Sequence, residues 1–195
     1  YGQPDYNKDG IYDNPHLMHY PYTWIDDYYP LVKTKEHYLL RKTLEINYTV
    51  EIVEGWGTFS LAAIPESCKA SVLFKDDNVV LYEWNPSTNS YTPAEDVVPG
   101  KGYWIFSTKK ISKRIFGNAV DEETLYLRQG WNLIATIYSP KGGQVKLTCL
   151  NGSISHVFYE WSPSQRAYIP VTQLQPEKVY WVYAFENSTI VLSQT

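Results

Sequence analysis

The chain contains one pattern of residues twice. Each copy begins with Gly-Trp, continues through a Tyr-Glu-Trp-x-Pro-Ser turn to a separate Tyr, and closes with Tyr-Trp. The copies begin at Gly55 and Gly130 and their turns begin at Tyr82 and Tyr159, so the offset is 75 residues at the first landmark and 77 at the second. Internal repetition marks the residues that one structural unit requires. These residues are aromatics, prolines and glycines, which favours a repeated scaffold over an active site.

Alternation of apolar and polar residues predicts short strands along most of the chain. Before the first Gly-Trp, Leu44, Ile46, Tyr48, Val50 and Ile52 alternate with polar residues and indicate a half-buried strand. Further strands are predicted at 58–63, 71–74, 79–84, 102–107 and 113–116 in the first copy, and at 124–129, 132–138, 144–149, 156–161, 178–184 and 189–192 in the second. Short strands separated by Pro, Gly and Asn turns are typical of a β-sandwich or barrel.

We therefore predict an all-β fold of two tandem, pseudo-symmetric β-sandwich or barrel-like repeats, residues 43–118 and 119–195, after an N-terminal arm of residues 1–42. A repeat of about 75 residues is near the lower limit for an independent core, so we expect the two copies to pack against each other. Residues 1–30 are rich in Asp, Asn, Pro and Tyr without an alternating pattern. They are expected to form an ordered loop, followed by a helical turn at 36–42.

Composition excludes some classes of partner. A net charge of −4 gives no electrostatic reason to bind nucleic acid or an anionic membrane. No apolar run approaches the eighteen or more residues that a membrane-spanning helix needs, so we expect no membrane span. The hydrophobic content of 44% and aromatic content of 16% suffice for a β core.

The chain has two cysteines, Cys68 and Cys149, one in each copy. Their spacing excludes a Cys-x-x-Cys zinc or redox motif. In an oxidising compartment they could form a disulfide between the copies, and the alternative is two buried free thiols.

The motifs of the second copy resemble a β-repeat common in secreted bacterial surface proteins. They are Gly-Trp-Asn-Leu-Ile-Ala at 130–135, Tyr-Glu-Trp-Ser-Pro at 159–163 and Val-Tyr-Trp-Val at 179–182. The first copy departs at its start, where Gly57-Thr58-Phe59 replaces Asn-Leu-Ile. The resemblance implies an extracellular or cell-surface location and a structural or adhesive role, and it brings no catalytic residues.

The repeated aromatic residues have two interpretations. We expect packing, in which the indole rings staple a thin β core, because a repeated position is usually a packing position. The alternative is a carbohydrate platform, for which Tyr91 and Tyr168, at equivalent turn ends, are the better glycan contacts. The six expected structural tryptophans are Trp56, Trp84, Trp104, Trp131, Trp161 and Trp181.

Residues 5–13 have the pattern of a calcium loop, with oxygen ligands at alternate positions and Gly10 sixth. The expected ligands are Asp5, Asn7 and Asp9 by side chain, Ile11 by its carbonyl, and Asp13 directly or through water. The segment resembles the loops of dockerins and thrombospondin type 3 repeats. It departs from them at the twelfth position, His16, so Asp26 or Asp27 might complete the site from a distance. The alternative is a polar turn.

These features predict a non-enzymatic extracellular module, stabilised by calcium, that forms part of a surface fibre, filament or adhesin. Strand addition at an exposed sheet edge would join it to other copies or to other surface proteins. The alternative is a carbohydrate-binding module of a secreted polysaccharide-active protein. An enzyme is not expected, since the sequence lacks a Ser-His-acid arrangement, a phosphate loop and a His-Glu-x-x-His motif.

Overall fold

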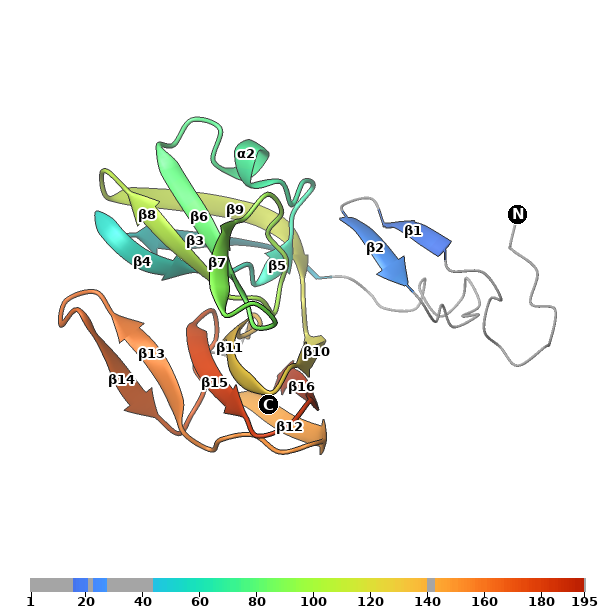
Figure 1. Cartoon of the computed structure of the whole chain (residues 1–195). Coiled ribbons are helices and arrows are strands. Elements are labelled where there is room, and N and C mark those ends of the chain that lie inside the picture. Colours follow the sequence, from blue (N-terminus) through green and yellow to red (C-terminus); the bar gives the residue numbers. More distant parts are fainter. Residues whose placement is uncertain (1–15, 21–22, 28–43, 140–142, 195) are drawn as a thin grey trace. The chain divides into compact units, whose positions relative to one another are not determined.

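The computed structural model describes residues 16–20, 23–27, 44–139 and 143–194. Contacts divide the chain into two units, Tyr1–Leu44 and Glu45–Thr195, and the second unit contains both copies of the repeat. Among the described residues the structure is mostly β, and α2 (Ala70–Leu73) is the one helix (Figure 1). No helix in this part of the chain is long and apolar enough to cross a membrane.

The first unit contains a two-stranded antiparallel sheet. Strand β1 (His16–Tyr20) pairs with β2 (Thr23–Asp27), with His16 opposite Asp27 and Tyr20 opposite Thr23. The sequence predicts an ordered loop here, and this prediction is corrected. The hairpin forms without an alternating pattern because local backbone pairing and residues that favour strands, Thr23 to Ile25 among them, suffice. The predicted helical turn at 36–42 lies outside the described residues.

The second unit consists of four antiparallel sheets. When the strands are counted from the start of each half, both halves have the order 2-6-4-5 in a four-stranded sheet and 1-7-3 in a three-stranded sheet. The first half contains β3 (Glu45–Ile52), β4 (Gly55–Phe59), β5 (Ala63–Ile64), β6 (Val79–Asn85), β7 (Ser90–Pro93), β8 (Tyr103–Ser107) and β9 (Ile111–Ala119). The second contains β10 (Glu122–Leu127), β11 (Gly130–Ala135), β12 (Val145–Asn151), β13 (Phe158–Ser162), β14 (Ala167–Val171), β15 (Val179–Ala184) and β16 (Ser188–Gln194).

The segment around α2 is the clearest difference between the halves. The sequence predicts a strand at 71–74, and the structure has a helical turn there, which corrects this prediction. Ala70 and Leu73 favour helix, and the turn is closed by the amide of Phe74 donating to the Ala70 carbonyl over 3.0 Å. The two-residue strand β5 takes the place in the three-stranded sheet that β12 takes in the second half.

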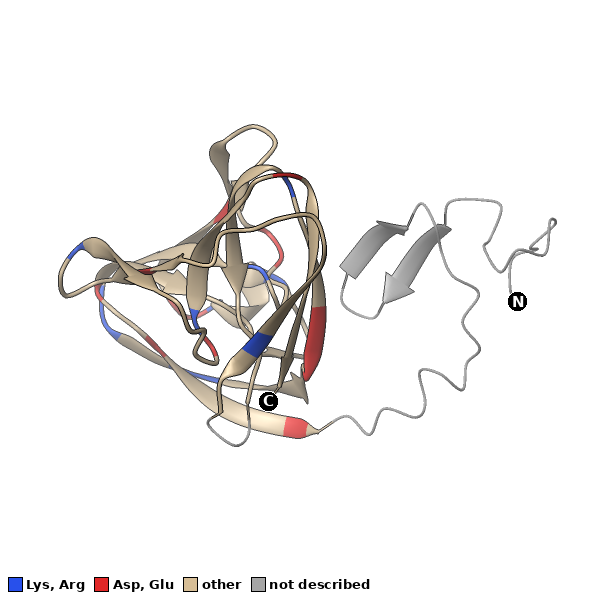
Figure 2. Ribbon diagram, turned by 90° about the horizontal axis from the view of Figure 1, so that it is seen from below, with Lys and Arg blue, Asp and Glu red and all other residues tan. Residues whose placement is uncertain are grey.

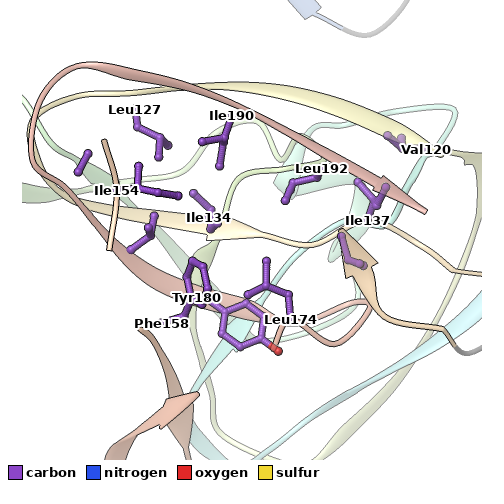
Figure 3. Close-up of a cluster of buried hydrophobic side chains, with 13 residues drawn as sticks. Val120, Leu127, Ile134, Ile137, Ile154, Phe158, Leu174, Tyr180, Ile190 and Leu192 are labelled. Carbon is purple, nitrogen blue, oxygen red and sulfur yellow. The ribbon is translucent and has the colours of Figure 1, made fainter. Parts of the chain in front are cut away.

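Each half encloses its own core between its two sheets. Alternation explains which residues fill it, because successive side chains of a strand point to opposite faces. In β8, Tyr103 and Ile105 are buried, and in β15, Tyr180 and Val182 are buried. Figure 3 shows the core of the second half, where Tyr180 lies beside Phe158 and Leu174 under aliphatic side chains of the three-stranded sheet.

Both buried tyrosines use their hydroxyl groups in the same way. The Val98 amide donates to the Tyr103 hydroxyl over 3.0 Å, and the Gln175 amide donates to the Tyr180 hydroxyl over 3.0 Å. Burial raises the pKa of Tyr180 to about 12. Each tyrosine therefore closes the turn that precedes its strand and satisfies a backbone group that would otherwise lack a partner.

Candidate functional site

The six repeated tryptophans lie on the outer faces of the two four-stranded sheets. Trp104 follows the buried Tyr103 and Trp181 follows the buried Tyr180, so both indoles point away from the cores. Trp56 is 48% exposed and Trp131 is 41% exposed. The expectation that these rings staple the core is therefore corrected, because the period of two that buries the tyrosine of each Tyr-Trp pair turns the tryptophan outward.

Four of the tryptophans join the two halves. We call the contact between residues 45–119 and residues 122–194 the seam. Trp84 meets Trp181 with ring centroids 5.2 Å apart at 80°, and Trp104 meets Trp161 at 5.2 Å and 65°. Both arrangements are edge to face, which suits the charge distribution of aromatic rings. Since Trp84 matches Trp161 and Trp104 matches Trp181 in the repeat, each contact is the counterpart of the other.

Ring contacts within each half also correspond. Trp84 packs against Tyr91 at 5.0 Å, and Trp161 packs against Tyr168 at 5.2 Å. Each hairpin holds its pair in register, because Trp84 is opposite Tyr91 and Trp161 is opposite Tyr168. The repeated separate tyrosine therefore braces the tryptophan that crosses the seam.

Backbone groups come close together at the centre of the seam. The Ala135 amide donates to the Gly100 carbonyl over 2.8 Å, and the Gly102 amide donates to the Leu133 carbonyl over 3.2 Å. A Cβ atom on Gly102 would lie 2.5 Å from Cγ1 of Val179 and 3.0 Å from the Ile134 carbonyl oxygen. This approach therefore requires glycine at position 102.

Two half-buried carboxyl groups lie near the seam. Glu123 of β10 lies against Gly100, where its Cγ would be 2.8 Å from an added Cβ, and burial raises its pKa to about 7. Burial also raises the pKa of Glu177. The pKa of Tyr48 is raised to about 12, chiefly by burial and to a smaller degree by the charge of Glu177. Glu123 follows Tyr48 by 75 residues and Glu177 follows Gly100 by 77, the offsets of the repeat.

The raised pKa of Glu123 predicts that the protein is more stable in acid than at neutral pH. The stabilising contribution is complete below the unfolded pKa near 4.5 and is lost as pH rises through about 7. We expect the free energy of unfolding to fall by about 2–3 kcal/mol across this range. Urea unfolding between pH 4.5 and 8 should show a flatter profile for Glu123→Gln than for the exposed Glu186→Gln. Identical profiles would contradict this account.

An open groove of about 400 Å³ lies along the seam. Its walls come from both halves, and no charged side chain is among the residues that line it. Tyr91 and Tyr168, the two tyrosines that the sequence suggests as glycan contacts, both line it. We call this the aromatic groove, and its lining residues are Trp84, Tyr91, Trp131, Tyr159, Tyr168 and Trp181.

Comparisons of the chain with protein-family models, curated proteins and solved structures found no match. The functional argument therefore depends on the site alone.

The polar groups around the seam are unequally satisfied. Trp84 Nε1 donates to the Trp131 carbonyl oxygen over 2.8 Å, which ties a ring of the first half to the second. The buried Nε1 atoms of Trp104 and Trp161 have no hydrogen-bond partner among the described residues. Burial, and secondarily Tyr168, raises the pKa of Tyr91, so this phenol stays protonated and can donate a hydrogen bond at neutral pH.

Charged residues near these strands are paired. Lys101 Nζ donates to a carboxylate oxygen of Glu83, and Lys178 Nζ lies 3.0 Å from a carboxylate oxygen of Glu160. Figure 2 shows basic and acidic positions interspersed along the ribbon of the second unit. The aromatic groove therefore presents rings and hydroxyl groups rather than charge.

The two cysteines are free, which corrects the prediction of a disulfide. Cys68 is buried in the first half, where its carbonyl accepts a hydrogen bond from the Val97 amide. Cys149 is exposed on β12, with its sulfur 3.1 Å from the Asn151 carbonyl oxygen. Two buried thiols, the other alternative, is therefore correct for Cys68 alone.

The predicted calcium ligands Asp5, Asn7, Asp9, Ile11 and Asp13 lie outside the described residues. Within the residues that the structure describes, no group of three or more His, Cys, Asp or Glu side chains could hold a metal ion.

Sequence reasoning omitted Tyr159 and Trp181 as members of a binding surface. The signal was present, because Tyr159 and Trp161 are two residues apart on one strand and must share a face. The alternation of Tyr180 and Trp181 carries the same information. What the sequence does not contain is the pairing of the two outer faces across the seam.

Proposed function

We propose that this chain is a non-enzymatic carbohydrate-binding module of an extracellular protein and that the aromatic groove holds the glycan. One observation carries this proposal: Tyr91 and Tyr168, 77 residues apart, line the same groove with four other aromatic rings. Sugar rings present C–H bonds with partial positive charge, which are attracted to the negative faces of aromatic rings. A concave, mostly apolar site with a few hydroxyl groups suits such a ligand.

The proposed function can be tested with single ring deletions. Trp131→Ala or Tyr168→Ala should weaken glycan binding about tenfold, equivalent to about 1.4 kcal/mol, because each removes a stacking surface. Glycan arrays followed by calorimetry on the best ligand would measure the loss. Tyr126→Ala is the matched control, since Tyr126 is 82% exposed on β10 and does not line the groove. Absence of binding to any glycan, or equal loss in the control, would contradict the proposal.

We also propose that the two halves are copies of one unit related by a pseudo-twofold axis along the seam. The shared strand orders and the exchanged tryptophan contacts support this relation. It explains why the repeat retains aromatic residues that lie outside both cores, because each copy needs them to bind the other.

A calcium site in the N-terminal arm is proposed at Asp5, Asn7, Asp9, Ile11 and Asp13. The β1–β2 register puts Asp27 opposite His16, the twelfth loop position, which supports Asp27 as the additional acidic ligand. Calcium at a hundredfold excess over its Kd would stabilise the arm by about 2.7 kcal/mol.

Calcium removal should therefore expose the arm to proteolysis. Titration of CaCl₂ into the full chain should give one binding event per molecule, and Asp9→Ala should weaken it at least about tenfold because a charged ligand is lost. EDTA should accelerate trypsin cleavage at Lys8. Asp76→Ala, outside the loop, serves as the control. Equal calcium affinity in Asp9→Ala and the control would exclude this loop as the site.

Assembly into a surface fibre is the second candidate function. Strand β3 pairs along its full length with β9 of the same chain, and it has no sheet neighbour on its other side among the described residues. That open edge supports strand addition by another copy. Sedimentation and electron microscopy at increasing concentration test it, and a monomer under all conditions would exclude it.

A further inference from the structure

A second group of exposed aromatic rings lies around Trp56. This ring contacts Tyr82 at 6.0 Å, Trp104 at 6.2 Å and Phe106 at 5.2 Å. Trp56 is 48% exposed, so these contacts leave much of its surface open. We call Trp56, Tyr82, Trp104 and Trp161 the second aromatic cluster.

The contacts of Trp56 match those of Trp131, which lines the aromatic groove. Trp131 meets Tyr159 at 5.7 Å, Trp181 at 6.3 Å and Tyr183 at 5.2 Å. Its exposure of 41% is also similar. The second cluster therefore offers a ligand the same kind of ring surface as this wall of the groove.

Tyr168 connects the two surfaces. It lines the aromatic groove, and its ring also packs against Trp161 at 5.2 Å and Trp104 at 6.5 Å. Trp104 in turn contacts Trp56. Aromatic rings are therefore continuous from the groove to Trp56, and a ligand could follow them without leaving aromatic surface.

The polar surroundings indicate an uncharged ligand. Glu83 and Glu160 are each paired with a lysine, so neither is left to bind a cation or repel an anion. The hairpin turns beside the rings carry hydroxyl groups, including Thr88 and Ser90 at one turn and Ser162 at the other. Hydroxyls exchange donor and acceptor roles with sugar hydroxyls, whereas uronate or sulfate groups would require cations.

From these contacts we infer that the ligand is a neutral, unbranched glycan chain that extends from the aromatic groove, past Tyr168, onto the second aromatic cluster. This inference rests on the proposed carbohydrate-binding function and adds the substrate class and a second subsite. A groove of about 400 Å³ has the size of a small-molecule site and holds one end of such a chain.

The test uses ligand length. Calorimetry would measure Kd for cello-, manno-, xylo- and chito-oligosaccharides of increasing length, with oligogalacturonides as the acidic comparison. We expect affinity to rise about tenfold between the shortest and longest neutral ligands that bind, because the second subsite adds about 1.4 kcal/mol. Acidic oligomers of the same length should bind at least tenfold more weakly.

Two matched substitutions separate the subsites. Trp56→Ala should abolish the tenfold difference between long and short ligands. Trp131→Ala should weaken both by about the same factor and preserve that difference. Tyr126→Ala is the control, and melting temperatures would establish that each variant is folded.

The outcomes distinguish the two proposals. If a neutral glycan binds through Trp131 but the length dependence is absent or survives in Trp56→Ala, the second subsite is excluded and the groove function stands. Tight binding of the acidic oligomers would overturn the neutral substrate class. If every oligosaccharide fails to bind, or a proline-rich peptide binds instead, the proposed function and this inference both fail.

Discussion

Replacing Gly102 by alanine is expected to lower the free energy of unfolding by about 2–3 kcal/mol, a cost typical of overpacking a tightly packed site. The new methyl group would lie 2.5 Å from Cγ1 of Val179, 3.0 Å from Cγ of Leu133 and 3.0 Å from the Ile134 carbonyl oxygen. A side chain can move away, but the carbonyl belongs to a backbone that is bonded across the seam. Urea denaturation of both proteins would measure the difference.

Gly57→Ala is the matched control, because its added Cβ would meet nothing closer than Cγ2 of Val53 at 3.2 Å. We expect a loss below about 1 kcal/mol there. Combining Gly102→Ala with Val179→Ala removes the closest clash and should recover part of the stability relative to the sum of the two single changes. Equal stability of Gly102→Ala and the wild type would show that the seam is not closely packed.

The second large effect is expected at Trp84 and Trp181. Each single alanine substitution should cost about 3–4 kcal/mol, because it removes a large ring that packs against the small apolar cluster of Leu133, Ala135 and Val179. The two substitutions should also be coupled by about 1 kcal/mol, since the rings meet edge to face at 5.2 Å. A double-mutant cycle from denaturant unfolding gives this coupling directly.

The exchanged contact provides a replicate and a control for this cycle. Trp104 and Trp161, also 5.2 Å apart, should show a similar coupling. Trp84 and Trp161 hold equivalent places in the two halves, and no ring contact joins them among the described residues, so their losses should add to within about 0.5 kcal/mol. Coupling in the control pair, or none in the contacting pairs, would contradict the exchanged arrangement.

Local patterns predicted much of the strand content. The alternation of Leu44 to Ile52 locates β3, and the repeated motifs locate β6, β8, β13 and β15 within one or two residues. The strands β7 and β14 were not predicted, because Ser90 to Pro93 and Ala167 to Val171 lack strong alternation. They form because each pairs with the preceding strand across a short turn.

The candidate site could be predicted only in part. Repetition identifies Tyr91 and Tyr168 as members of a shared unit, but their convergence on one groove depends on contacts between segments 77 residues apart. The divergence between copies held a further signal, since Gly102 stands where the second copy has Val179. That difference makes sense only when both residues are known to meet across the seam.

The exchange of tryptophan contacts has a consequence for the covalent link between the halves. An isologous contact of this kind is the one that two separate subunits make in a homodimer. Joining the subunits in one polypeptide does not create the contact, and it acts instead by keeping the partner at a high effective concentration. The fusion thereby frees each copy to diverge on its own, so that one binding face can change its preference while the other still holds the pair together.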